Sequence, residues 1–148
     1  MIEDSRVLDL FAGTGALGLE AASRGAKSVD FVEIDKVAFS SLNQNVESAR
    51  QGFAKTEQQP QLKTWALDAK KFAKQSSKEY DLIFVDPPYE LTNHAIAEIL
   101  ANLDGSLATN AVVVIERASR DVRPEVDGLV FEEEKKYGDT AVYLFRKN

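Results

Sequence analysis

Residues 7–21 read Val7-Leu8-Asp9-Leu10-Phe11-Ala12-Gly13-Thr14-Gly15-Ala16-Leu17-Gly18-Leu19-Glu20-Ala21. This stretch begins as a short apolar strand, turns through glycines and continues as a helix that we expect to end at Gly25. The three glycines have the spacing G-x-G-x-x-G, which lets the backbone approach a ligand and places a helix N-terminus beside it. Dinucleotide-binding proteins share this spacing, so the glycines alone do not identify the ligand. A tight turn without a ligand is the simpler alternative.

On either side of this stretch, short apolar segments alternate with segments of helical period, which is the pattern of βαβ units around a parallel sheet. Only Gly138-Asp139 separates the last two apolar segments, so we expect them to form an antiparallel hairpin. The expected helices cover residues 15–24, the surroundings of 39–49, residues 69–75, and a segment that starts after Thr92 or Asn93. The expected strands cover residues 6–10, 28–33, 62–67, 81–86, 111–116, 129–137 and 140–146.

The composition limits the possible functions. The 148 residues are expected to form one domain, 1–148, and the absence of cysteine and the single histidine argue against thiolate and multi-histidine metal sites. The polar N-terminus does not look like a signal peptide, and the longest apolar run, 111–115, is far too short to span a membrane. We therefore expect a cytoplasmic monomer without a metal. The net charge of −6 weighs against tight independent binding of nucleic acid.

A second loop follows the apolar run Leu82-Ile83-Phe84-Val85 and reads Asp86-Pro87-Pro88-Tyr89. The Asp86 carboxylate and a neighbouring backbone carbonyl can both accept hydrogen bonds from a planar NH2 group, on whose ring Tyr89 can stack. Neither proline has a backbone N–H, so this stretch offers acceptors without competing donors. The sequence therefore indicates a loop that holds an amine. A core aromatic after a strand is the simpler reading of Tyr89.

Acidic residues also follow the second and third expected strands. Glu33 can accept hydrogen bonds from both hydroxyls of an adenosine ribose, with Asp35 as an alternative that can instead simply cap the next helix. Asp68 can accept from an adenine amino group while the Ala69 N–H reaches a ring nitrogen, although a plain helix N-cap is the simpler reading of Asp68. In an open parallel sheet these loops border one crevice at the carboxyl ends of the strands.

These motifs, together with Phe31-Val32-Glu33-Ile34-Asp35 and Tyr137-Gly138-Asp139-Thr140, resemble the RsmD family over nearly the whole chain. That family comprises S-adenosylmethionine-dependent methyltransferases acting on guanine N2 of small-subunit (16S) ribosomal RNA. The resemblance implies a class I methyltransferase fold: a Rossmann-like three-layer α/β sandwich with a seven-stranded, mostly parallel sheet and a C-terminal antiparallel β-hairpin. It implies ribosomal RNA or a small-subunit assembly particle as the partner.

The resemblance also assigns roles to residues. Asp86, Pro87 and Tyr89 would be catalytic, with the Asp86 carboxylate and the Pro87 carbonyl drawing the N–H bonds of the amine out of plane. Pro88 and Tyr89 would contact the substrate. Independently of the resemblance, Arg117 and Arg120 are expected to contact RNA because they follow the fifth expected strand, near the substrate side of the crevice. No strong base is required, so His94 is expected to be a surface residue of a helix. S-adenosylmethionine would be held by Asp9, Phe11, Ala12, Gly13, Thr14, Gly15, Glu33, Ile34, Asp68, Ala69 and Asp86.

One departure from the family pattern stands out, because only Met1 to Ser5 precede the first strand where family members usually carry a basic N-terminal extension. We expect either a catalytic-domain fragment or a short relative.

Several functions stay open. The Asp-Pro-Pro-Tyr motif also occurs in adenine-N6 and protein glutamine-N5 methyltransferases, and the glycine turn alone permits a nicotinamide-dependent oxidoreductase. A domain that only binds a cofactor is a further possibility.

Overall fold

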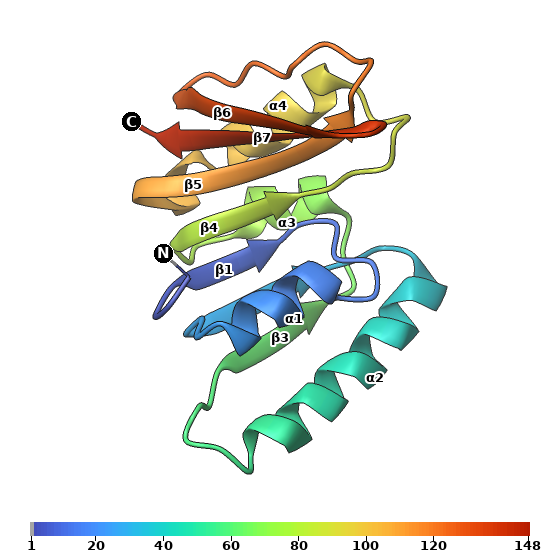
Figure 1. The fold of residues 1–148 in the computed structure, drawn as a ribbon, viewed down its shortest axis with the longest axis vertical. Helices are drawn as coiled ribbons and strands as arrows, with labels where there is room; N and C mark the ends of the chain where they lie inside the picture. Colours follow the sequence, from blue (N-terminus) through green and yellow to red (C-terminus); the bar gives the residue numbers. More distant parts are fainter. Residues whose placement is uncertain (1) are drawn as a thin grey trace.

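The computed structural model describes residues 2–148, which form one seven-stranded sheet in the order β3-β2-β1-β4-β5-β7-β6 (Figure 1). Strands β1 to β5 are parallel, and β7 pairs antiparallel with both β5 and β6. The expected sheet with its terminal hairpin is confirmed. The elements are β1 (Arg6–Asp9), α1 (Ala16–Ser23), β2 (Ser28–Val32), α2 (Lys36–Phe53), β3 (Gln61–Trp65), α3 (Ala69–Gln75), β4 (Tyr80–Val85), α4 (Asn93–Asn102), a 3-10 turn (Asp104–Ser106), β5 (Leu107–Ala118), β6 (Leu129–Tyr137) and β7 (Thr140–Lys147).

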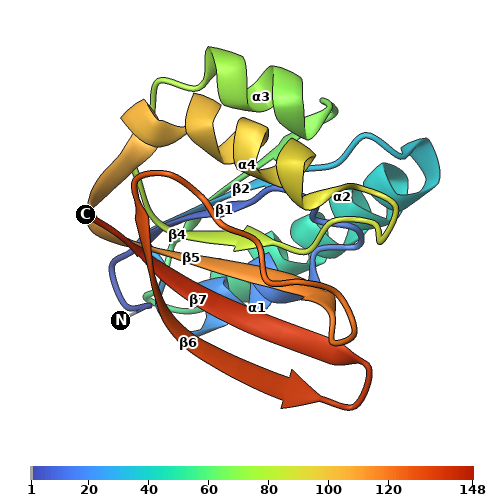
Figure 2. The ribbon, with the colours of Figure 1, turned by 90° about the horizontal axis from the view of Figure 1, so that it is seen from above.

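Helices cover both faces of the sheet, with α1 and α2 on one face and α3 and α4 on the other (Figure 2). The alternation of side chains along each strand produces this division. Val7 of β1 packs with the α1–α2 cluster, while Leu8 packs with the α3–α4 cluster. The result is the expected three-layer sandwich, with an apolar core on each side of the sheet.

The strand order reverses beside β1, since the chain moves from β1 outward to β2 and β3 and then returns to β4. The pairing of Asp9 with Phe31 on one side and Phe84 on the other brings the carboxyl ends of β1, β2 and β4 together. Hydrogen bonds continue beyond β1, from Leu10 N–H to the Phe84 carbonyl at 3.1 Å and from Ala12 N–H to the Val32 carbonyl at 2.9 Å. A crevice at such a switch point is where open α/β sheets bind ligands.

The expected boundaries hold closely in some places. Helix α3 begins and ends as predicted, Gly25 has a left-handed backbone with φ of 100°, and Tyr137 pairs with Thr140 across the two-residue turn. Thr92 is the N-cap of α4, and its hydroxyl accepts a hydrogen bond from Ala95 N–H. The main difference is β5, which starts at Leu107 and not at residue 111 because the strand continues through a bend in which Asn110 has a φ of 65°.

Candidate active site

The three glycines of the turn between β1 and α1 lie in different surroundings. Gly13 has a φ of 59°, and a Cβ built there would have no other atom within 4 Å. The turn is therefore open at Gly13. Gly18, in contrast, lies against the sheet, because its Cβ would come within 2.4 Å of Phe31 Cε2. Gly15, at the N-cap of α1, has a φ of 97° and is buried under Leu42. Only the first glycine is thus left free to approach a ligand.

Glu33 ties this turn to the end of β2. Its Oε1 accepts a hydrogen bond from Gly13 N–H at 2.7 Å, and its Oε2 accepts one from Asp35 N–H at 2.9 Å. Each carboxylate oxygen has a second lone pair, so Glu33 retains acceptor capacity for hydroxyl donors. The side chain of Asp35 accepts from Ala38 N–H at 2.9 Å, so Asp35 acts as a helix cap.

Asp9 is the most unusual acid of the site. It is 1% exposed, its Oδ2 accepts from Gly18 N–H at 3.2 Å, and its Oδ1 is buried without a hydrogen-bond partner. Burial raises the pKa of this carboxyl to about 7, against the effect of the Gly18 bond, and the charges of Asp86 and Glu33 raise it further. An unpaired buried acceptor is costly unless a ligand supplies a donor. The Asp9 carboxyl therefore suits a ligand that carries N–H groups or a positive charge.

A small hollow of about 30 Å³ lies at the carboxyl ends of β1, β2 and β3. Ile34 is 62% exposed at its rim, so its apolar side chain is accessible to a ligand. Asp68 occupies the N-cap of α3, but its side chain makes no capping hydrogen bond. Its carboxylate is thus available to a ligand. The lining consists of Leu10, Phe11, Val32, Glu33, Ile34, Leu67, Asp68 and Ala69, so five of the residues predicted to hold a cofactor meet here.

The predicted amine-holding loop follows β4. Pro87 is buried, whereas Asp86 and Pro88 are exposed and Tyr89 is 62% exposed. This exposure excludes the alternative that Tyr89 is a core aromatic. Partial loss of hydration raises the pKa of the Asp86 carboxyl, although a hydrogen bond with the Glu116 side chain acts in the opposite direction.

Glu116 is a site residue that the sequence-based reasoning missed. It is half-buried near the end of β5, and burial together with the neighbouring Asp86 raises the pKa of its carboxyl. Because Val85 pairs with Ile115, each acid comes one residue after the paired position. That equal offset is the signal that could have revealed the pair.

The two predicted RNA-contacting arginines differ. Arg117 is 4% exposed and turns to the α4 side, where its Nη2 donates to the Leu91 carbonyl at 2.6 Å and its Nε to Asn93 Oδ1 at 3.1 Å. The expectation that it contacts substrate is therefore corrected, because this guanidinium is held inside the protein and fixes the segment that follows Tyr89. Arg120 is exposed, as a substrate-contacting residue requires, and His94 is exposed on α4 as expected.

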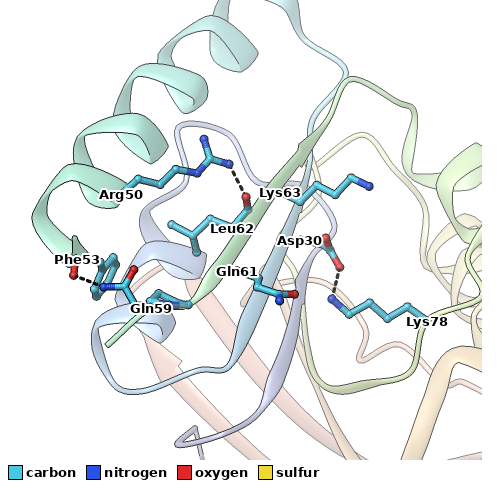
Figure 3. A pocket seen from close by; sticks show the side chains of 9 residues that line it. Asp30, Arg50, Phe53, Gln59, Gln61, Leu62, Lys63 and Lys78 are labelled. Carbon is cyan, nitrogen blue, oxygen red and sulfur yellow. Dashed lines mark hydrogen bonds and ion pairs between the residues drawn. The ribbon is translucent and has the colours of Figure 1, made fainter. Parts of the chain in front are cut away.

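A larger hollow, of about 510 Å³, lies elsewhere, beside the first residues of β3 and the end of α2 (Figure 3). Its lining shares no residue with the predicted site. Asp30 in its wall is buried and fully engaged, accepting from Tyr80 Oη at 2.7 Å, Lys78 Nζ at 3.2 Å and Trp65 Nε1 at 3.3 Å. We interpret this network as structural.

Within residues 2–148, no group of three or more potential metal-binding side chains is found. None of the helices in this range has the length and hydropathy that a membrane-spanning helix needs.

Comparison with known proteins identifies the family. The family model described as "Conserved hypothetical protein 95" matches residues 1–146. The chain belongs to this family. A ribosomal RNA small subunit methyltransferase D from Haemophilus influenzae is 36% identical over 117 residues, which cover 78% of this chain and 58% of that protein. The enzyme of the same name from Escherichia coli K12 is 30% identical, covering 99% of this chain and 71% of its own length.

Solved structures support the same assignment. The "putative methyltransferase yhhF" of Escherichia coli superposes with a TM-score of 0.82 at 30% identity, covering all of this chain and 79% of that one. A "conserved hypothetical protein" of Streptococcus pyogenes superposes with a TM-score of 0.85 at 29% identity, covering 99% of this chain and 88% of its own. The fold is therefore the class I, Rossmann-like methyltransferase fold that the sequence predicted.

Proposed function

We propose that this chain is the catalytic domain of an S-adenosylmethionine-dependent methyltransferase that modifies the exocyclic N2 amine of a guanine in small-subunit ribosomal RNA. The main support is the position of two loops at neighbouring strand ends. Asp86 lies beyond β4 and Asp9 ends β1, and the Leu10–Phe84 hydrogen bond joins the two strands there. The printed names of the relatives, ribosomal RNA small subunit methyltransferase D, support the substrate class.

The residues of the crevice fit S-adenosylmethionine. The unpaired Oδ1 of Asp9 suits the ammonium group of the methionine part, and the open turn at Gly13 leaves room for the ligand. Phe11, Ala12 and Thr14 would complete this side, with Gly15 forming the turn behind them, and Glu33 would accept from the ribose hydroxyls. Ile34 and Asp68 with Ala69 would hold the adenine between an apolar surface and a polar edge. When bound, the cofactor supplies an electrophilic methyl group on a positively charged sulfur.

The chain's own contribution is to position the amine and stabilise its charge. The Asp86 carboxylate and the Pro87 carbonyl accept the two N–H groups and direct the nitrogen lone pair at the methyl carbon. Transfer to this nitrogen would leave the electron pair of the broken methyl–sulfur bond on sulfur, and the methylated nitrogen, still held by Asp86 and Pro87, would lose a proton to solvent. Preoriented acceptors stabilise the charge that develops on nitrogen. Alignment of the two reactants lowers the reaction barrier by roughly 7–11 kcal/mol. Tyr89 stacks on the base, which must leave any helix to reach the loop.

Transfer of a labelled methyl group tests the proposal. The chain is incubated with labelled S-adenosylmethionine and either unmodified small-subunit ribosomal RNA or assembling particles, and the product is digested to nucleosides. We expect label in N2-methylguanosine. Label in N6-methyladenosine or in a protein glutamine would support the alternative methyltransferase activities, and calorimetric binding of a nicotinamide cofactor in place of S-adenosylmethionine would support the oxidoreductase. That the protein is a monomer and acts in the cytoplasm stays a prediction.

A further inference from the structure

Two carboxyl groups meet beside the proposed amine-holding loop. Two side chains of β4, Leu82 and Phe84, face the α1–α2 side of the sheet, and two of β5, Val112 and Val114, face the same side. Because side chains alternate along a strand, Asp86 and Glu116, which come two residues after Phe84 and Val114, point to that side as well. The Asp86 and Glu116 carboxyls lie next to each other there, each one residue beyond the paired Val85 and Ile115, and each affects the pKa of the other. Asp9 of β1 faces the same side of the sheet, because Val7, two residues earlier, packs with the α1–α2 cluster, and its Oδ1 is buried without a partner.

The pair lacks a compensating cation. Within residues 2–148, no lysine or arginine forms an ion pair with Asp86 or Glu116. Arg117, next to Glu116 in the chain, turns to the opposite face and donates to the Leu91 carbonyl. Two adjacent acceptor groups without a basic partner suit a ligand that presents two adjacent N–H donors.

The three amines that an Asp-Pro-Pro-Tyr loop accepts differ in what stands beside the amine. In guanine, the N1–H donor is adjacent to the N2 amine. In adenine, the atom next to the N6 amine is N1, which has a lone pair and no hydrogen, and in a glutamine amide it is the carbonyl oxygen. A second carboxylate beside Asp86 therefore pairs with guanine and repels the other two.

We propose that Glu116 determines specificity by accepting the N1–H of guanine while Asp86 and the Pro87 carbonyl hold the N2 amine. This inference rests on the proposed function and deepens it. The direct edge contact supplies discrimination that stacking on Tyr89 cannot, because every base has a stacking face.

A substrate analogue combined with variants of Glu116 isolates this contact. Once the methylated guanine is located, the same RNA is synthesised with 2-aminopurine at that position, which keeps the 2-amine but lacks both the N1–H and the O6 of guanine. We expect the wild-type chain to prefer the guanine RNA by about tenfold or more in kcat/KM, as one good base-edge contact allows. In Glu116→Ala and Glu116→Leu, kcat/KM for the guanine RNA should fall. The ratio of kcat/KM for the guanine RNA to that for the 2-aminopurine RNA should then be about twofold or less. Glu57→Ala, an exposed acid in the loop before β3, serves as the control and should keep the preference.

The preference is measured within each variant, so a reduced folded fraction lowers both rates equally and leaves the ratio intact. If the variants at Glu116 keep the wild-type ratio, the assignment of Glu116 is overturned while the proposed function stands. If the wild-type chain forms no N2-methylguanosine, the proposed function fails and this inference fails with it.

Discussion

The backbone N–H of Gly13 donates to Glu33 Oε1 at 2.7 Å, although 20 positions of sequence separate the two residues. The second oxygen of the same carboxylate accepts from Asp35 N–H at 2.9 Å. One side chain therefore fixes both the turn after β1 and the start of the loop after β2. The two loops that would enclose the cofactor are held in place by a residue that is itself expected to contact it.

Replacing Glu33 should affect cofactor binding more than stability. In Glu33→Ala, we expect the Kd for S-adenosylmethionine, measured by calorimetry, to rise by about tenfold or more, since charge-assisted hydrogen bonds contribute roughly 1.5–3 kcal/mol each. Glu33→Gln should lie between, because its single amide oxygen can replace only part of the acceptor set. An unchanged Kd in Glu33→Ala would remove Glu33 from the cofactor site.

Asp9 should make stability depend on pH. Its pKa of about 7 in the folded chain lies above its ordinary value of 3.8, so the folded state retains a proton that the unfolded state loses. Stability should therefore fall as the pH rises from about 4 to about 7 and then level off, by up to roughly 4 kcal/mol. Urea titrations of the wild-type chain and Asp9→Asn measure this difference. If the free energy of unfolding depended on pH in the same way in both proteins, the raised pKa of Asp9 would be contradicted. Asp127→Asn, which changes an exposed loop acid, serves as the control.

Tyr89 is expected to act through its ring. Tyr89→Ala should raise KM for RNA by about fivefold or more, since stacking on a base contributes about 1–3 kcal/mol, whereas Tyr89→Phe should change it little. Because the side chain is 62% exposed, neither change should alter the melting temperature much. Equal losses in the two variants would instead assign the function to the hydroxyl.

The two arginines after β5 should separate stability from RNA binding. Arg117→Ala leaves the Leu91 carbonyl and Asn93 Oδ1 without their donor, and we expect it to destabilise the fold by at least about 1.5–3 kcal/mol. Arg120→Glu should leave stability unchanged and weaken RNA binding, with a shallower dependence on salt. Denaturant titrations and binding measurements at several salt concentrations check both. An unaltered salt slope in Arg120→Glu would place the RNA elsewhere.

The fold was readable from the sequence because its signals are local. The glycine turn, the two-residue hairpin turn at Gly138-Asp139 and the N-cap at Thr92 each act within a few residues. The start of β5 was misjudged because Asn110 interrupts the apolar run while the strand continues past it.

Residues of the candidate site could be proposed from the sequence only where strand ends carry a motif. Asp9, Glu33 and Asp86 each follow an apolar run, and parallel strands bring such ends together. Arg117 was misplaced because sequence shows that an arginine follows a strand, but not that its side chain faces α4. Glu116 was missed because its importance depends on the register between β4 and β5, which no single segment contains.

The role of the Asp86 carboxylate is tested by comparing Asp86→Ala with the wild-type chain in two measurements on the same preparation. These are cofactor binding by calorimetry and single-turnover methyl transfer to ribosomal RNA. We expect the Kd for S-adenosylmethionine to stay within about threefold, while the rate of transfer falls by about 10²–10³ or more, as expected when a preoriented group that stabilises developing charge is removed. A variant that binds the cofactor normally and transfers the methyl group at a near-wild-type rate would contradict the central role of the Asp86 carboxylate.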